Sequence, residues 1–298
     1  MTPVNLFAGS YLDRRAEARL REDWLAEARG DTHTIYICMR EAAALVRPGN
    51  LAGTTHVAFL SGADPRVAGT VDPERIVLLG WYRDQRCLLV DLPAEHAIEA
   101  RGETFAELRP LAAELPVDEA GLIAYARALQ LWRANHRHCG RCGTPTNSTR
   151  AGHARRCPAC GHESFPRLDP AIIVLVHTGD SALLGRQASW QPGRYSTIAG
   201  FVEPGESLED AVRREVREET GITAREIAYH SSQPWPFPSS LMLGFTARAD
   251  RATPVPHDGE LEDARWFDRA ELLDGSVLLP PRESISRRLI DGWLHDAA

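Results

Sequence analysis

The stretch that most constrains the fold of this chain is residues 200–222, GFVEPGESLEDAVRREVREETGI. Ser207 and Asp210 have the spacing of a capping box, which starts a helix. Gly221 is a residue type that commonly follows the last turn of a helix. The stretch therefore predicts a helix of about three turns, preceded by a loop that contains glycine.

The glutamates of this predicted helix fall on an unexpected side. At about 100° per residue, Glu215, Glu218 and Glu219 lie at the edge of the apolar face or within it, whereas the arginines cover the other side. Carboxylates that crowd beside a core repel one another, and a divalent cation removes this conflict. The phasing therefore predicts a Mg²⁺ or Mn²⁺ site. The alternative, an acidic solvated helix with ion pairs, explains neither the phasing nor the loop.

The same stretch resembles the Nudix box, G-x5-E-x7-R-E-U-x-E-E-x-G-U, in which U is aliphatic. Every defined position is filled: Gly200, Glu206, Arg214, Glu215, Val216, Glu218, Glu219, Gly221 and Ile222. The resemblance implies a Nudix hydrolase, in which a β-sheet lies between helices and a nucleoside diphosphate linked to another group is hydrolysed. It further implies that Glu215, Glu218 and Glu219 are metal ligands and catalytic residues. Glu206 and Arg214 are expected to pair, supporting the loop that begins at Gly200.

This chemistry agrees with the charge pattern. Metal ions neutralise the negative oxygens of a pyrophosphate and lower the pKa of water, which makes hydroxide available near neutral pH. Glu219 is the candidate general base, although members of the family differ in which carboxylate has this role.

Four cysteines form two pairs, Cys139-x2-Cys142 and Cys157-x2-Cys160. Two such pairs bring four thiolates to one tetrahedral centre, which suits Zn²⁺ and leaves no open position for a substrate. Each pair is followed by a glycine, Gly143 or Gly161, which permits the positive φ of a tight turn. The spacing therefore predicts a structural zinc ribbon.

Ten residues after the box, the sequence reads SQPWPFPSS at 232–240. Three prolines make this segment stiff and exclude it from the centre of a sheet. A rigid display of aromatic and polar groups loses little entropy on binding, so a recognition wall is one interpretation and a structural loop is the other. Together with the ribbon, the segment resembles the signature of the NADH pyrophosphatases. This resemblance implies hydrolysis of NADH or NAD⁺ to nicotinamide mononucleotide and AMP, and possible removal of NAD caps from RNA 5′ ends.

The resemblance also implies roles for further positions. Phe201 matches an aromatic that stacks on a base, and Phe165, usually tyrosine in the family, matches a second one. Glu260 matches another metal-binding glutamate. The expected substrate-binding set is Phe201, Phe165, Gln233, Trp235, Ser240 and Ser286, the last where the family's backbone meets the base. Members of the family are typically homodimers.

The rest of the sequence predicts an α+β protein of three parts: a β-rich domain with a linker helix (1–134), the ribbon (135–166) and a Nudix α/β/α sandwich (167–298). Short apolar runs before residue 116 predict strands, and residues 118–134 predict the linker helix. We detect no internal repeat. All 34 basic residues are arginine, so arginine frequency alone does not indicate phosphate binding.

Two other functions are considered as alternatives. One is a Nudix hydrolase of ADP-ribose or a diadenosine polyphosphate, which SQPWPFPSS disfavours. The other is a zinc-ribbon protein that binds nucleic acid, which the net charge of −7 and the intact box disfavour. Neither a secretory signal nor an apolar run of membrane-spanning length is apparent, so we expect a cytoplasmic location and no membrane partner.

Overall fold

The computed structural model describes residues 5–67, 72–96, 98–256 and 259–295. The outermost residues of the two termini, which contributed to the expectations about targeting, lie outside these ranges. The chain forms two compact units. One comprises Phe7–Arg167, and the other comprises the chain from Leu168 onward together with Asn5 and Leu6. Each unit combines strands and helices, in agreement with the predicted α+β class.

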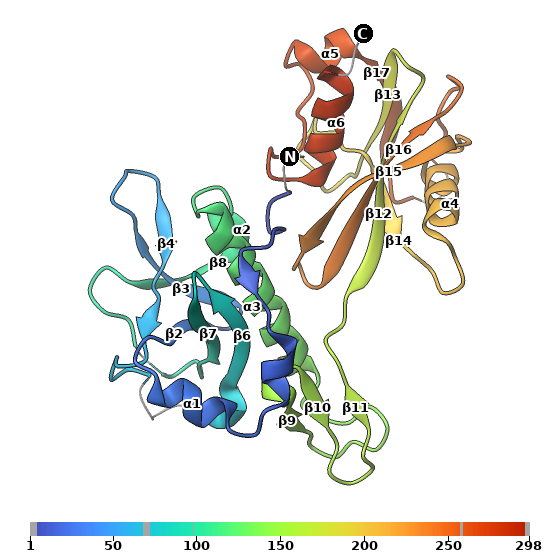
Figure 1. The fold of residues 1–298 in the computed structure, drawn as a ribbon. Helices are drawn as coiled ribbons and strands as arrows, with labels where there is room; N and C mark the ends of the chain where they lie inside the picture. Colours follow the sequence, from blue (N-terminus) through green and yellow to red (C-terminus); the bar gives the residue numbers. More distant parts are fainter. Residues whose placement is uncertain (1–4, 68–71, 97, 257–258, 296–298) are drawn as a thin grey trace. The chain divides into compact units, whose positions relative to one another are not determined.

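The second unit is built around a six-stranded sheet (Figure 1). Its main path is β15 (Arg225–Trp235), β16 (Ser240–Arg248), β12 (Asp169–His177), β13 (Ser181–Arg186) and β17 (Asp263–Asp268), and β14 (Ile198–Phe201) pairs with β12. The β12 and β16 strands are parallel, whereas the other pairs are antiparallel. β12 and β13 form an antiparallel hairpin, and its turn contains Gly179 and Asp180.

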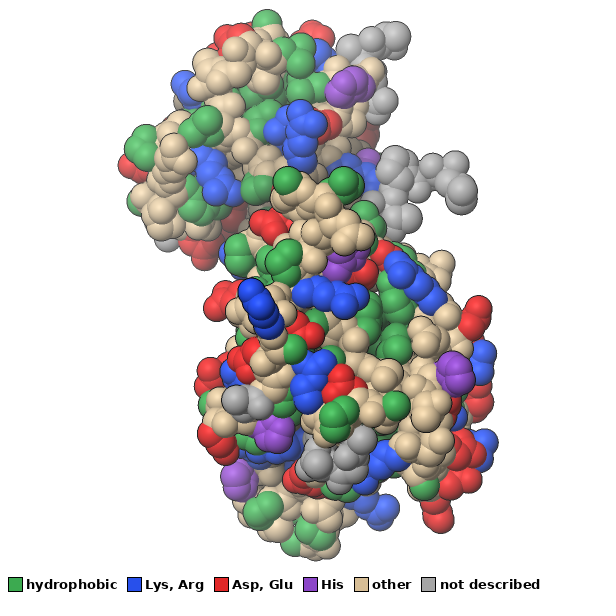
Figure 2. Space-filling model, turned by 90° about the vertical axis from the view of Figure 1, so that its left-hand side faces the viewer, with side chains coloured by type: hydrophobic (Ala, Val, Ile, Leu, Met, Phe, Trp, Pro, Cys, Tyr) green, Lys and Arg blue, Asp and Glu red, His purple; other side chains and the backbone are tan. Residues whose placement is uncertain are grey.

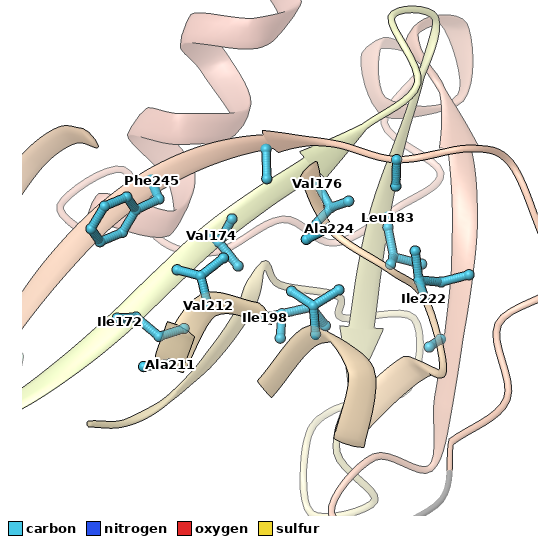
Figure 3. Close-up of a cluster of buried hydrophobic side chains, with 14 of the residues drawn as sticks. Ile172, Val174, Val176, Leu183, Ile198, Ala211, Val212, Ile222, Ala224 and Phe245 are labelled. Carbon is cyan, nitrogen blue, oxygen red and sulfur yellow. The ribbon is translucent and has the colours of Figure 1, made fainter. Parts of the chain in front are cut away.

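Helices cover both faces of this sheet. Helix α4 (Leu208–Thr220) packs on one face, and α5 (Arg269–Leu273) and α6 (Ile285–His295) pack on the other. Figure 3 shows Ala211 and Val212 of α4 turned toward Ile172 and Val174 of β12. Burial of these apolar side chains is what fixes α4 against the sheet. The expected sandwich of a sheet between helices is therefore confirmed.

Helix α4 has the limits that its sequence predicts. Ser207 is the N-cap, and its hydroxyl accepts a hydrogen bond from the Asp210 amide at 3.1 Å. At the other end, Gly221 has a φ of 72°, a left-handed conformation that side chains disfavour.

The first unit contains an eight-stranded sheet with the main path β1 (Leu12–Asp13), β6 (Ile76–Tyr82), β7 (Gln85–Asp91), β2 (Ile35–Arg40), β3 (Ala43–Pro48) and β4 (Thr55–Val57). β5 (Leu60–Ser61) pairs with β2, and β8 (Thr104–Glu107) pairs with β3. The helices are η1 (Ala16–Leu20), α1 (Trp24–Gly30), η2 (Pro73–Arg75), α2 (Leu108–Leu111) and α3 (Val117–Asn135). Helix α3 confirms the predicted linker helix, and the strands confirm a β-rich region.

The two units share a strand order that the sequence did not reveal. Strands β2, β3, β5, β6, β7 and β8 pair as β12, β13, β14, β15, β16 and β17 do, including one parallel pair, β2 with β7. A short and then a longer helix follow the last of these strands in both units. The expectation of no internal repeat is therefore wrong at the level of topology. Between β5 and β6, the described residues form η2 rather than a helix such as α4.

The zinc ribbon belongs to the first unit. Its strands β9 (Asn147–Thr149), β10 (Ala154–Arg156) and β11 (Glu163–Ser164) form a three-stranded sheet, with η3 (Arg150–Gly152) between the first two. Within the described parts of the chain, none of the helices combines the length and apolar character needed to cross a lipid bilayer.

Candidate active site

Arg214 is the centre of the hydrogen-bond network at α4. Its Nε and Nη2 donate to the two carboxylate oxygens of Glu206 at 2.6 and 2.9 Å, which is the bidentate geometry favoured by guanidinium groups. Nη2 also donates to the Phe201 carbonyl at 2.8 Å, and Nη1 donates to Glu215 at 2.8 Å and Glu218 at 3.0 Å. One side chain thus joins β14, the loop after it and two glutamates of the helix.

The Glu206–Arg214 pair fixes the conformation of the loop. Glu206 also accepts a hydrogen bond from the Glu203 amide at 2.9 Å, so the carboxylate holds the loop backbone as well as the helix. These bonds, first of all that from Arg214, lower the pKa of Glu206 to about 2. The loop contact therefore persists in its ionised form throughout the neutral and mildly acidic range.

Gly200 packs directly against the carboxylate of Glu215. A Cβ atom at position 200 would lie 1.9 Å from Cδ of Glu215, which is far inside any van der Waals contact. Only glycine leaves room for this carboxylate between β14 and α4. Glu215 can therefore occupy this position only if residue 200 is a glycine.

Burial and like charge surround Glu215. Burial, with the nearby charges of Glu218 and Glu260, raises the pKa of Glu215, and Arg214 opposes this effect. Glu219 is also buried, with 4% exposure, whereas the Glu218 side chain is 51% exposed. Two of the three glutamates therefore lie on the buried side of α4, as the phasing predicts. Glu260, outside the helix, is thus one of the charges that act on Glu215.

These residues fit a hard divalent cation. They supply carboxylate oxygens, which are the ligands that Mg²⁺ and Mn²⁺ prefer, and the crowded charges favour a counter-ion. Among the described residues, the three helical glutamates do not form a group whose ligand atoms all lie within 4.8 Å of one another. Glu215 and Glu218 both accept a hydrogen bond from the Nη1 atom of Arg214.

The four cysteines do form such a group. Their sulfur atoms all lie within 4.8 Å of one another, and three Sγ–Sγ distances are 3.4, 3.6 and 3.7 Å (Cys142–Cys157, Cys139–Cys160 and Cys142–Cys160). Tetrahedral Zn²⁺ with Zn–S bonds of about 2.3 Å needs sulfur atoms about 3.8 Å apart.

The two turns of this group have the same geometry. Gly143 and Gly161 have φ values of 74° and 73°, as the sequence predicts. The amide of Arg141 donates to the sulfur of Cys139 at 3.4 Å and lowers the pKa of that thiol, which favours the thiolate that binds metal. The geometry of the site thus agrees with structural zinc.

The predicted aromatic residues are accessible. Phe201 follows Gly200 at the end of β14 and is 59% exposed, so a planar group can reach its ring. Phe165 lies in the ribbon of the first unit and is 50% exposed, with the guanidinium of Arg150 5.1 Å from its ring centroid.

The proline segment ends an edge strand. β15 stops at Trp235, and the Trp235 and Phe237 rings meet edge to face with centroids 5.2 Å apart. The Phe237–Pro238 peptide bond is cis. The exclusion of this segment from the centre of a sheet is confirmed, because β15 is the outermost strand.

Gln233 has a different environment from the one predicted. It is completely buried, its amide nitrogen donates to the Leu6 and Glu283 carbonyls, and its oxygen accepts from the Ile285 amide. In this arrangement the side-chain amide of Gln233 is not available to a substrate, because both of its N–H groups donate to protein carbonyls.

The two predicted serines are also buried. Ser240 is 8% exposed at the start of β16, where it pairs with Trp235 and Asp169. Ser286 is 4% exposed in the first turn of α6, and its hydroxyl contacts Thr197 and Ser196. A role for position 286 through its backbone is compatible with this burial.

Sequence reasoning missed two features of the site. One is the reach of Arg214 to the Phe201 carbonyl and Glu215, beyond its expected partner. The other is the contribution of Asn5 and Leu6, which lie more than 220 residues from the strand that they contact. No local pattern marks such a pair, because the partners are joined only by the fold.

Family models match most of the chain. A NUDIX domain model matches residues 167–291, an NADH pyrophosphatase zinc ribbon domain model matches 134–165, and an NADH pyrophosphatase-like rudimentary NUDIX domain model matches 14–132. The last match agrees with the strand order that both units share.

Curated relatives match between about two thirds and nearly all of the chain. The chain is 45% identical to the NAD-capped RNA hydrolase NudC of Stutzerimonas stutzeri, over 69% of this chain and 71% of that protein. It is 44% identical to the Pseudomonas aeruginosa protein of the same name, over 72% and 76%. It is 32% identical to the human NAD-capped RNA hydrolase NUDT12, over 97% of this chain and 73% of that protein.

Proposed function

Because this chain belongs to the Nudix hydrolases of the NADH pyrophosphatase type, we propose that it hydrolyses the pyrophosphate of NADH or NAD⁺ to nicotinamide mononucleotide and AMP. The observation that carries this proposal is the set of carboxylates on α4, with Glu215 and Glu218 bonded to Arg214, Glu219 buried and Gly200 packed on Glu215, in one unit with SQPWPFPSS. Relatives named as NAD-capped RNA hydrolases support the same bond in NAD-capped RNA as a second substrate.

Each residue of the cluster has a part in this reaction. Glu215, Glu218, Glu219 and Glu260 would hold Mg²⁺ or Mn²⁺, and the bound cation would neutralise the pyrophosphate oxygens and acidify water at the site. Glu219, buried on α4, is the proposed general base and takes a proton from the attacking water at its carboxylate. Arg214 orients the Glu215 and Glu218 carboxylates by hydrogen bonds and holds the loop through Glu206. These carboxylates are therefore preorganised before substrate binds.

Recognition is assigned to the surroundings of the cluster. Phe201 stacks on a base, and Phe165 is proposed as the second aromatic. Trp235 forms part of the wall, and Ser240 and the backbone at Ser286 border it. Gln233 contributes by holding this wall in place from the interior.

Four further properties belong to the proposal. The protein acts as a homodimer in the cytoplasm, with structural Zn²⁺ in the ribbon, and the domains divide at residues 134–135 and 166–167. Acidic and basic side chains lie interspersed on the face shown in Figure 2. Because the net charge of the chain is −7, RNA recognition is assigned to the cap and its neighbouring nucleotides rather than to extended backbone contacts.

A side-by-side comparison of substrates tests this function. We would measure kcat/KM on NADH, NAD⁺, NAD-capped RNA, ADP-ribose and a diadenosine polyphosphate with Mg²⁺ and with Mn²⁺. Hydrolysis of one of the three NAD substrates should exceed that of the other nucleotides. In Glu219→Gln, kcat should fall at least about a hundredfold, because the charge and the base are lost together. Higher kcat/KM on ADP-ribose or the polyphosphate would reject the assignment.

A further inference from the structure

The outer edge of the second unit's sheet is held by a residue from the other end of the sequence. Among the residues that the structure describes, β15 is the edge strand and pairs with a strand, β16, on one side only. Asn5 lies there with 7% exposure, and its Nδ2 donates to the Ser232 carbonyl at 2.7 Å and the Ser231 hydroxyl at 3.1 Å. Its Oδ1 accepts a hydrogen bond from Arg288 of α6 at 2.8 Å. Asn5 therefore ties the edge strand to α6.

Gln233 extends this connection at the next position of the strand. Its Nε2 donates to the carbonyls of Leu6 at 3.2 Å and Glu283 at 2.8 Å, and its Oε1 accepts from the Ile285 amide at 2.9 Å. Its side chain has no solvent exposure. Asn5 and Leu6 thus share one buried hydrogen-bond network with the start of α6.

The network borders the proposed recognition wall on two sides. Side chains two apart on a strand point to the same face, so Trp235 lies on the α6 side of β15, as Gln233 does. At the start of α6, the Ser286 hydroxyl accepts from the Thr197 amide at 3.3 Å and contacts the Thr197 hydroxyl at 2.8 Å. Thr197 directly precedes β14, which ends at Phe201. A displacement of β15 relative to α6 would therefore move the groups that are assigned to recognition.

We propose that Asn5 is a positioning residue for substrate recognition, because it fixes the distance between the proline segment and the first turn of α6. This inference rests on the proposed function. Asn5 acts through Ser232, Arg288 and the Gln233 network rather than on the reacting atoms, which lie at α4. Its loss should therefore weaken binding of the dinucleotide more than the chemical step.

The test compares three variants in the full-length chain. Asn5→Ala should raise KM for NADH about tenfold, the scale of one lost buried hydrogen bond with its unsatisfied partners, while kcat stays within about twofold. Asn5→Asp keeps the acceptor for Arg288 but loses the donor to Ser232, so it should lie between Asn5→Ala and the wild type. Asn50→Ala, at an exposed asparagine of the first unit, is the matched control and should leave KM unchanged.

A second readout does not depend on activity. The Ile285 amide donates to Gln233, so its hydrogen-exchange rate should rise about tenfold in Asn5→Ala and remain unchanged in Asn50→Ala. Wild-type KM and wild-type exchange in Asn5→Ala would overturn the proposal. A lower melting temperature with reduced kcat and unchanged KM would also overturn it, since a merely structural role predicts that result. If the wild type does not hydrolyse NADH, the proposed function fails, and exchange at Ile285 still decides whether Asn5 orders the start of α6.

Discussion

At the scale of single residues, the site depends on a position that has no side chain. Gly200 leaves the space that the Glu215 carboxylate occupies, and Arg214 then holds that carboxylate from the other side. Glu215 is therefore held in place by the space beside Gly200 and by its hydrogen bond from Arg214. Its position is thus determined by close packing as well as by charge.

The first prediction concerns this contact. Gly200→Ala should displace Glu215, reduce cation affinity and lower kcat at least about tenfold, because misplaced groups lose transition-state contacts. Gly292→Ala is the control, since a Cβ at this position of α6 would lie 3.9 Å from Nε2 of His230, an ordinary van der Waals contact. Cation titration and steady-state kinetics of both variants are the measurements. Equal behaviour of the two variants would contradict the steric account.

The second prediction concerns pH. The folded protein raises the pKa of Glu215, so this carboxyl takes up its proton at a higher pH than an ordinary glutamate, whose pKa is about 4.3. Cation affinity should therefore be highest above the raised pKa and should fall as pH decreases through it, before ordinary glutamates protonate. Calorimetric titration of Mg²⁺ or Mn²⁺ over a pH series measures this. An affinity that stays constant down to about pH 4.3 would argue against it.

The third prediction concerns stacking. Phe201→Ala should weaken binding of NADH and NAD-capped RNA by about 1–3 kcal/mol, since both present the same adenosine. Tyr229→Ala is a matched control, because Tyr229 is equally exposed at 59% but packs on Phe245. KM for NADH and KM for NAD-capped RNA are measured for each variant. If Phe201→Ala and Tyr229→Ala change KM alike, Phe201 is not the stacking platform.

Sequence reasoning at this scale succeeded where partners are near in sequence. Glu206 and Arg214 are eight residues apart in one motif, and the structure pairs them. Gln233 is expected to bind substrate only because the family resemblance implies it, through a polar position of the proline motif. Its partners Leu6 and Glu283 lie 227 and 50 residues away, and only the folded chain shows that they saturate its amide.

At the scale of elements, the zinc ribbon is joined to the first domain by buried polar contacts. His153 contacts the Leu78 carbonyl of β6 at 2.7 Å, and burial lowers its pKa to about 4, so it is neutral near pH 7. Arg133 of α3 donates to the Gly152 carbonyl at 3.0 Å and the Ser148 hydroxyl at 2.9 Å. These bonds make the ribbon part of the packing of the first unit.

The fourth prediction follows from this packing. Cys157→Ser should lose zinc and lower the stability of the whole first unit, because metal binding and folding are linked. Elemental analysis should give about one Zn per chain for the wild type and less for the variant. Cys87→Ser, at a buried cysteine outside the ribbon, should retain its zinc. A metal-free wild type with full stability would rule out the site.

Helix α4 was predictable because its start and end are set locally, by the Ser207 hydroxyl and by the positive φ of Gly221. The strand order of the first unit was not. Strand runs such as 35–40 and 85–91 are apolar in sequence, but their parallel pairing joins residues about 50 apart. Many strand orders satisfy the same apolar pattern, so pairing must be read from the structure.

At the scale of the whole molecule, one topology occurs twice and one copy carries the Nudix box. Strands can keep their order while their sequences diverge, because the packing of a sheet interior requires mainly apolar side chains of suitable volume. The repeat is therefore not apparent from the residue pattern of this one chain, whereas the family model that matches residues 14–132 detects it. In the second unit, α4 lies between β14 and β15, whereas the described residues between β5 and β6 include only η2 as a helix. The catalytic claim thus rests on the second unit alone.

Product analysis tests this central claim most directly. NADH is incubated with the wild type and with Glu219→Gln, each with and without Mg²⁺ or Mn²⁺, and the products are separated by chromatography. The account predicts reduced nicotinamide mononucleotide and AMP in equal amounts, only with the cation, and at least about a hundredfold more slowly in the variant. Release of nicotinamide, cation-independent turnover or an equally active Glu219→Gln would contradict cleavage of the pyrophosphate at α4.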